Sequence, residues 1–200
     1  MYKCTIIHCQ MDEFNRDDLF ELIYWEDDSQ NSQHVVHKIC REKQAKQAKI
    51  LLGSFDTHFR LDYHGVVDIT EPTDKLIPDE DRDKYTICVI SFMGTHSEQR
   101  LKTRASITQR MQLGQINFGI INFVRCKDKK LIDSFHDPGS KAWINQALKI
   151  DNKAVFIDDS NDHIRSTNTL NIENLDTILF QGDKSELLEL LKKQITLFMQ

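Results

Sequence analysis

Residues 153–162 read "KAVFIDDSND", a hydrophobic run that ends in a pair of aspartates. The continuous apolar stretch 153–158 predicts a short strand that is buried on both faces of a sheet. Acidic residues placed directly after such a strand fall in the loop beyond its carboxyl end. What these aspartates do there depends on which other segments reach the same edge of the sheet.

Strands and helices alternate through the segments on either side. Further strands are expected at 59–62, 85–91, 116–124 and 176–180, and helices at 97–113, at 139–150 with Ser140 as N-cap, and at 184–198. This alternation predicts a three-layer, Rossmann-like α/β fold with a mostly parallel sheet covered on both faces. Ligands of such sheets bind beyond the carboxyl ends of the strands.

The first 55 residues differ in pattern from the remainder. We expect residues 1–55 to form a small N-terminal extension of unknown role and residues 56–200 to form the α/β core. Within the extension, "YKCTIIHC" (2–9) predicts a strand, while "DDLFELIYW" (17–25) and "KICREKQAKQAK" (38–49) predict helices.

Composition favours an ordinary globular protein of the cytoplasm. The 200 residues are 40% hydrophobic and carry a net charge of −5, so nucleic acid is not indicated as a partner. Two basic clusters, "RLKTR" (100–104) and "RCKDKK" (125–130), are typical of a solvated helix face and a polar loop, and would steer a phosphorylated or nucleic-acid substrate only if they flank the site. No signal peptide or membrane span is expected. Five cysteines without a disulfide spacing favour reduced thiols.

The extension also contains potential zinc ligands, namely Cys4, His8, Cys9, His34, His37 and Cys40. A zinc site needs four ligands in tetrahedral arrangement. No pair has the CxxC spacing, and cysteine also packs well as a small apolar residue. The pattern therefore favours structural roles for these residues over a metal site.

Polar side chains that phosphoryl transfer would need are expected at one edge of the sheet. They are Asp62, Ser91, Lys141, Asp158, Asp159 and Asp162. A carboxylate can attack phosphorus, a hydroxyl and a lysine can balance charge on the phosphoryl oxygens, and further carboxylates suit Mg²⁺. Carboxylates that merely cap loops and helices are the alternative interpretation.

In their order along the chain, these residues resemble the four motifs of the haloacid-dehalogenase-like (HAD) hydrolase superfamily, over about residues 56–182. "VFIDDSNDHI" is the most specific part of the match. The resemblance implies a magnesium-dependent phosphohydrolase that works through an aspartyl-phosphate. In it, Asp62 is the nucleophile, while Ser91 and Lys141 hold the phosphoryl group. Mg²⁺ is bound by Asp62, the backbone carbonyl of His64, Asp158, and Asp159 or Asp162.

The chain departs from this family at His64, where its phosphatases usually carry a second aspartate. A histidine can donate and accept protons near neutral pH, so His64 either serves as acid–base, fills space, or marks an inactive site. The last case leaves a catalytically impaired binding or regulatory module. Only 17 residues separate Gly65 from "DKYTICVIS", which implies a capless or minimally capped site for a large phosphorylated substrate.

Overall fold

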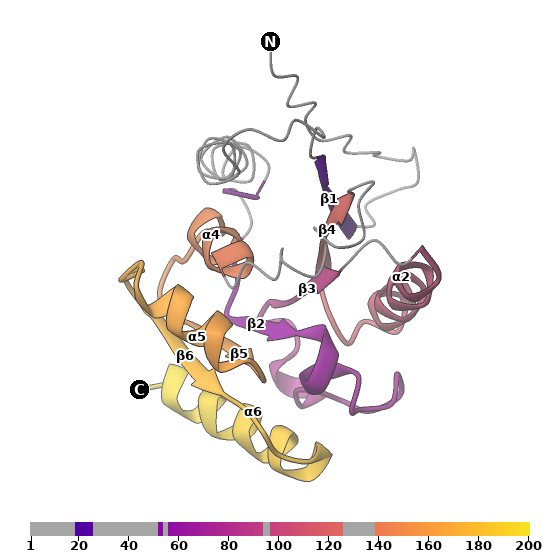
Figure 1. Ribbon diagram of the computed structural model, residues 1–200. Helices are drawn as coiled ribbons and strands as arrows, with labels where there is room; N and C mark the ends of the chain where they lie inside the picture. The colour runs from indigo at the N-terminus through magenta and orange to yellow at the C-terminus, as the bar shows by residue number, and fades with distance from the viewer. Residues whose placement is uncertain (1–18, 26–51, 54–55, 94–96, 126–138) are drawn as a thin grey trace.

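The protein is a Rossmann-like α/β structure built around a parallel sheet (Figure 1). The computed structural model describes residues 19–25, 52–53, 56–93, 97–125 and 139–200. Its strands are β1 (Leu19–Trp25), β2 (Phe59–Asp62), β3 (Ile87–Met93), β4 (Phe118–Arg125), β5 (Ala154–Asp158) and β6 (Leu175–Leu179). Its helices are α2 (Ser97–Gln112), α4 (Gly139–Ala147), α5 (Asn161–Asn168) and α6 (Lys184–Phe198).

The six described strands lie in the order β1-β4-β3-β2-β5-β6, and every neighbouring pair is parallel. Strand β2 is therefore central, with β3 on one side and β5 on the other. Leu61 of β2 pairs with Ile157 of β5, so the next residues, Asp62 and Asp158, end neighbouring strands at the same level. The expected parallel sheet with both aspartates at its carboxyl edge is confirmed.

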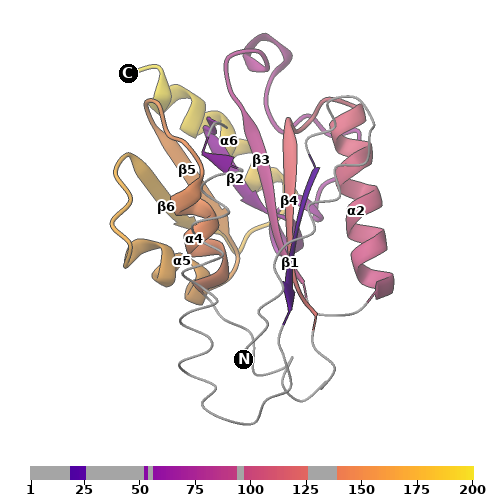
Figure 2. The same ribbon diagram turned by 90° about the horizontal axis from the view of Figure 1, so that it is seen from above.

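Helices cover both faces of the sheet, which completes the three layers (Figure 2). Side chains of α2 and α6 share one apolar cluster with Phe59 and Leu61, whereas α4 and α5 share the other with Ile90 and Phe156. Both apolar residues of β2 lie in the first cluster, whereas Arg60, between them, points to the opposite face and contacts the end of α4. All four residues of β2 are buried, although its sequence alternates apolar residues with the charged Arg60 and Asp62.

The helix expected over residues 17–25 is wrong, because Leu19–Trp25 forms strand β1. This strand pairs with β4 at the edge of the sheet, from Leu19 opposite Gly119 to Trp25 opposite Arg125. Isoleucine and three aromatic residues within seven positions favour a strand, and the open edge of β4 supplies the partner that decides it. The segment 1–55 thus contributes a strand to the main sheet.

The other expected elements that fall in the described residues are present, with ends displaced by up to three residues. Helix α4 already begins at Gly139, so Ser140 lies inside its first turn rather than before it. Helix α5 was not expected from the sequence. The strand at 2–9, the helix at 38–49, the proposed zinc ligands and most of the cluster 125–130 lie outside the described residues.

Candidate functional site

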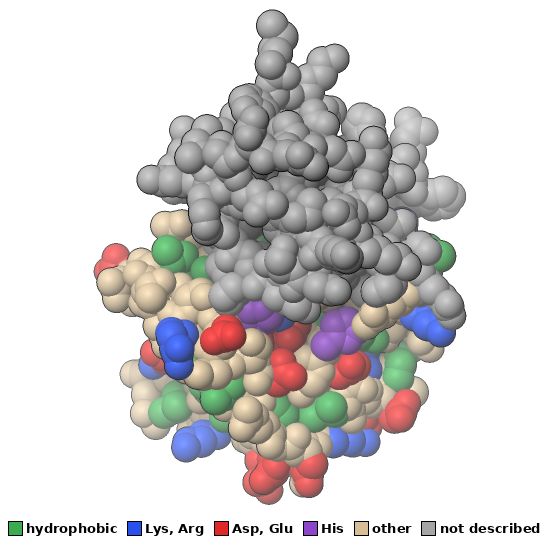
Figure 3. Space-filling model, in the orientation of Figure 1, with side chains coloured by type: hydrophobic (Ala, Val, Ile, Leu, Met, Phe, Trp, Pro, Cys, Tyr) green, Lys and Arg blue, Asp and Glu red, His purple; other side chains and the backbone are tan. Residues whose placement is uncertain are grey.

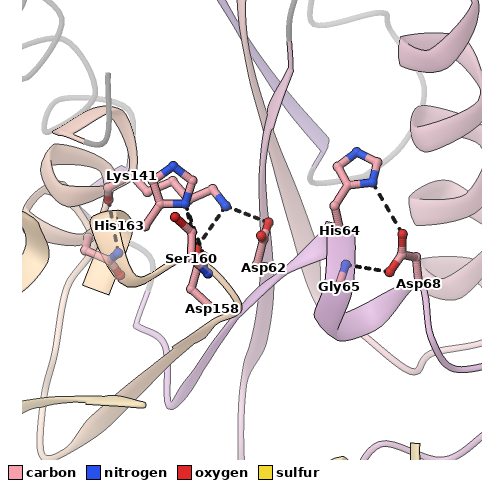
Figure 4. A network of polar contacts seen from close by, with 9 residues as sticks. Asp62, His64, Gly65, Asp68, Lys141, Asp158, Ser160 and His163 are labelled. Carbon is pink, nitrogen blue, oxygen red and sulfur yellow. Dashed lines mark hydrogen bonds and ion pairs between the residues drawn. The ribbon is translucent and has the colours of Figure 1, made fainter. Parts of the chain in front are cut away.

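Three buried charged side chains meet at the carboxyl edge of the sheet (Figure 4). Lys141, in the first turn of α4, places its Nζ 2.7 Å from Asp62 Oδ1 and 2.8 Å from Asp158 Oδ2. Asp62, Lys141 and Asp158 are 3%, 2% and 0% exposed. Removing one partner of an ion pair this deeply buried leaves the other charge uncompensated, which is strongly destabilising. The sequence-based expectation that these three residues lie together is confirmed.

The two carboxylates of this cluster differ in protonation. Burial raises the pKa of Asp62 to about 7, against the favourable charge of Lys141 and with the added repulsion of Asp158. Burial alone would also raise the pKa of Asp158, but the hydrogen bond from His163 and the charge of Lys141 lower it instead. Asp158 is thus the ionised member of the pair, whereas Asp62, with a pKa of about 7, is only partly ionised at neutral pH.

His163, on α5, is a member of the site that was not expected from the sequence. Its Nδ1 lies 3.1 Å from Asp158 Oδ1 and 3.2 Å from Oδ2, and the backbone N–H of Ser160 donates to Oδ1 at 2.8 Å. His163 directly follows the "DDSND" acids. The sequence pattern alone does not reveal its role, because only helix α5 turns residue 163 back toward Asp158.

Three side chains at this edge of the sheet could together hold a metal ion. Asp62, Asp158 and His163 each offer one ligand atom, and these three atoms lie within 4.8 Å of one another. The raised pKa of Asp62 is consistent with a site that lacks one positive charge, which a bound cation would supply. In the part of the chain that the structure describes, Asp159 and Asp162 are exposed and stand outside this group.

Asp159 lies against the turn that follows β2 instead. Gly65 has a φ of 76°, and a Cβ built on it would come within 2.2 Å of Asp159 Oδ2. Both facts require glycine, since a side chain would be strained there and would collide with the carboxylate. The close neighbour of the Gly65 backbone in the structure is therefore the carboxylate of Asp159.

His64 lies on the side of Asp62 away from Lys141 (Figure 4). Its Nδ1 is 3.3 Å from Asp68 Oδ2, while Asp68 Oδ1 accepts a hydrogen bond of 2.7 Å from the Gly65 N–H. The His64 Nε2 atom is buried and has no hydrogen-bond partner among the described residues. Asp68, which the sequence analysis did not single out, is therefore the residue that holds His64.

Ser91 lies on the neighbouring strand β3, one residue beyond the partner of Asp62. Asp62 pairs with Ile90 across β2 and β3. Ser91 is fully buried, and its Oγ has no hydrogen-bond partner in the described ranges. A buried hydroxyl without a partner is costly, so a ligand that supplied one would be favoured there.

A buried arginine fixes the helix that carries Lys141 against strand β2. Arg60 is fully buried, and its guanidinium donates to the backbone carbonyls of Asn145, Leu148 and Lys149 at the end of α4. Asn145 in turn donates through Nδ2 to the Lys141 carbonyl at 3.0 Å. Burial lowers the pKa of Arg60 to about 10, which leaves it charged at neutral pH. Arg60 thereby anchors α4 against β2, and with it the position of Lys141 relative to Asp62.

On the face of the molecule shown in Figure 3, histidine and acidic side chains lie side by side. A groove is lined by Arg82, Tyr85, Met111 and Asn117. It lies beside the first residues of β3 and β4, at the amino ends of the strands, whereas the site lies at their carboxyl ends. It does not belong to the site around Asp62.

None of the described helices combines the length and apolar character that crossing a bilayer would require. Comparison of the chain with protein-family models, with curated proteins and with solved structures finds no match.

Proposed function

We propose that this protein is a HAD-like phosphohydrolase in which Asp62 takes a phosphoryl group from a phosphorylated substrate and passes it to water. The observation that carries this proposal is the buried Asp62–Lys141–Asp158 cluster at the ends of two adjacent parallel strands. The Asp62 carboxylate pairs with the ammonium group of Lys141 and lies at the edge of the sheet where ligands of such folds bind.

The residues of the site divide the reaction between them. An oxygen of ionised Asp62 attacks phosphorus, the bond to the leaving oxygen breaks, and that oxygen takes up a proton. Water then attacks the phosphorus of the aspartyl-phosphate, which releases inorganic phosphate and restores the Asp62 carboxylate. Lys141 and the unpartnered Ser91 Oγ supply the positive charge and the hydrogen bond that the phosphoryl oxygens need.

Asp62, Asp158 and His163 are the residues that would hold the cation. Bound there, Mg²⁺ would neutralise charge on the phosphoryl oxygens and favour ionisation of Asp62. The ligand roles inferred from the resemblance for Asp159, Asp162 and the His64 carbonyl remain predictions.

The rival function is a binding or regulatory module without turnover. It is favoured by one observation, the engagement of His64 with Asp68 on the side of Asp62 away from Lys141. A module of this kind would still bind Mg²⁺ and a phosphoryl group at Asp62.

The test separates these two functions. We expect para-nitrophenyl phosphate to be hydrolysed only when Mg²⁺ is present, and Asp62→Asn to abolish hydrolysis. Asp176→Asn, on exposed strand β6, is the matched control and should leave hydrolysis unchanged. Beryllium fluoride, an analogue of the phosphoryl group, should give a ¹⁹F resonance with Mg²⁺ that Asp62→Asn removes. Binding of beryllium fluoride without hydrolysis would establish the binding module. If neither hydrolysis nor the ¹⁹F resonance is observed, both functions are refuted.

A further inference from the structure

The groove at the amino ends of β3 and β4 adjoins a second, smaller hollow. The groove has a volume of about 630 Å³ and the smaller hollow a volume of about 210 Å³, and Asp79, Arg82 and Gly114 line both. The smaller one, here called the apolar hollow, is lined by the apolar side chains of Pro72, Leu76, Ile77 and Leu113. The two form one continuous depression, with a polar part, an apolar part and an arginine where they meet.

Buried and paired side chains fix one wall of the apolar hollow. Arg110, on α2, is 1% exposed and donates to the Thr70 carbonyl, directly before the segment 72–77. Lys184, at the start of α6, places its Nζ 2.7 Å from Asp74 Oδ2 within that segment. The wall is thus tied to two helices, so the hollow exists before any ligand binds, as most small-molecule sites do.

Arg82 lies at the junction with most of its donors unused. Gly114 has a φ of 64°, a conformation that favours glycine, and its missing side chain leaves the space that the Arg82 guanidinium occupies. Among the described residues, this guanidinium makes one long hydrogen bond, of 3.4 Å to the Leu113 carbonyl, and pairs with no carboxylate. A planar guanidinium with free donors is suited to bind a carboxylate through two parallel hydrogen bonds.

The groove supplies a negative charge as well. Asp83 lines it and is exposed, and no basic side chain in the described part of the chain pairs with it. The nearby acids are paired, Asp79 with Lys75 and Asp81 with Lys84. One unpaired cation and one unpaired anion therefore line the same depression. A ligand that carries both a negative and a positive group would satisfy the two together.

We propose that this depression binds a free α-amino acid with a large apolar side chain, such as phenylalanine. Its carboxylate pairs with the Arg82 guanidinium, its ammonium group pairs with the Asp83 carboxylate, and its side chain enters the apolar hollow. A cavity of about 150 Å³ is sufficient for benzene, so the apolar hollow accommodates one aromatic side chain. This site lies at the opposite ends of the strands from Asp62, and the inference does not depend on the phosphohydrolase function.

The first measurement is a titration of ¹⁵N-labelled protein with L-phenylalanine to about 10 mM, followed by ¹H–¹⁵N correlation spectra. We expect saturable shifts of the amide signals of Leu76, Gly114 and Asn117, and none around Asp62. Phenylpropionate, which lacks the ammonium group, and phenethylamine, which lacks the carboxylate, should each bind about 10-fold more weakly. Absence of saturation, equal affinity for the three ligands, or shifts only around Asp62 would overturn the proposal.

The second measurement repeats the titration with variants. Arg82→Gln and Asp83→Asn should each weaken binding of L-phenylalanine by about 10-fold, because each removes one charged partner of the ligand. Arg165→Gln is the matched control, since Arg165 is also an exposed arginine but lines neither the groove nor the apolar hollow.

Phenethylamine separates a lost ion pair from a general disturbance of the site. It has no carboxylate, so Arg82→Gln should leave its affinity nearly unchanged, whereas Asp83→Asn should lower it. Circular dichroism must show that both variants are folded. Unchanged affinity of Arg82→Gln for L-phenylalanine, or an equal loss for L-phenylalanine and phenethylamine, would refute the proposed pairing.

Discussion

Lys141 Nζ lies 2.7 Å from Asp62 Oδ1 and joins the first turn of α4 to the end of the central strand β2. Asp158 Oδ2 lies 2.8 Å from the same Nζ. The ammonium group of Lys141 therefore pairs with two buried carboxylates, which lie 79 and 17 positions away from it in the sequence. Burying three charged groups together is costly for stability, and the cost depends on which of the three charges is removed.

Asp62→Asn should make the metal-free protein more stable at pH 7–8. Burial raises the pKa of Asp62 from 3.8 to about 7. As pH rises from 4 to 7, the unfolded chain therefore loses this proton before the folded protein does, and folded stability declines. Asparagine mimics the protonated group and avoids the loss. At ~1.4 kcal/mol per pKa unit, the gain should be about 2–4 kcal/mol at pH 8 and close to zero at pH 4.

Urea unfolding of both proteins across this pH range, with a chelator present, checks the prediction. A stability difference that stays constant with pH would show that folding does not raise the pKa of Asp62.

Lys141→Met should destabilise the protein by about 3–5 kcal/mol at pH 7, because it leaves the buried carboxylates without their cation. Combining it with Asp62→Asn should recover a large part of this loss, since one of the two charges is then gone. Lys149→Met is the control, because Lys149 pairs with Asp151 on the exposed surface and should change stability by less than about 0.5 kcal/mol. Equal losses for Lys141→Met and Lys149→Met in chemical denaturation would contradict the buried cluster.

Arg60→Lys should cost about 2 kcal/mol or more, although it keeps the positive charge. The guanidinium of Arg60 reaches three backbone carbonyls at the end of α4 and also Thr57 Oγ1 at 2.6 Å. A lysine ammonium cannot span this arrangement and leaves buried carbonyls without donors. Arg165→Lys, on the exposed surface of α5, is the control. Thermal unfolding of the two variants gives the comparison, and similar melting temperatures would refute this role of Arg60.

Metal binding should depend on His163 and not on Asp162. We expect Asp158→Asn to abolish binding of Mn²⁺, used as a paramagnetic substitute for Mg²⁺, and His163→Gln to weaken it by about 10-fold. Asp162→Asn should leave the affinity unchanged, because Asp162 is exposed and apart from the ligand group. Titration by electron paramagnetic resonance measures all three. Loss of affinity in Asp162→Asn rather than in His163→Gln would favour the ligand set inferred from the sequence.

Strands β3, β4 and β5 could be predicted because each is rich in apolar residues, a pattern that can be recognised without knowing the partner strands. "FRLD" and "KAVFID" ended where the structure ends β2 and β5, at Asp62 and Asp158. Strand β1 could not be predicted in this way. "LFELIYW" is compatible with a helix or a strand, and only the free edge of β4 selects the strand.

The residues of the site also divide into those that the sequence predicts and those that it does not. The order of Asp62, Ser91, Lys141 and Asp158 along an alternating pattern was sufficient to place them at one edge, because parallel strands end together. Asp68 and His163 were not identified, since each acts through a side-chain contact made after a local turn or helix brings it back toward the strand end.

By itself, the sequence determined the alternation of strands and helices and the acidic ends of β2 and β5, because burial pattern and chain order are local properties. Only the tertiary structure decided which groups touch. It set Lys141 between two carboxylates through the anchoring of α4 by Arg60, it brought His163 to Asp158, and it turned His64 toward Asp68. Charge, protonation and hydrogen bonding in a buried site depend on distances of a few ångströms, and those distances arise only when separate segments pack together.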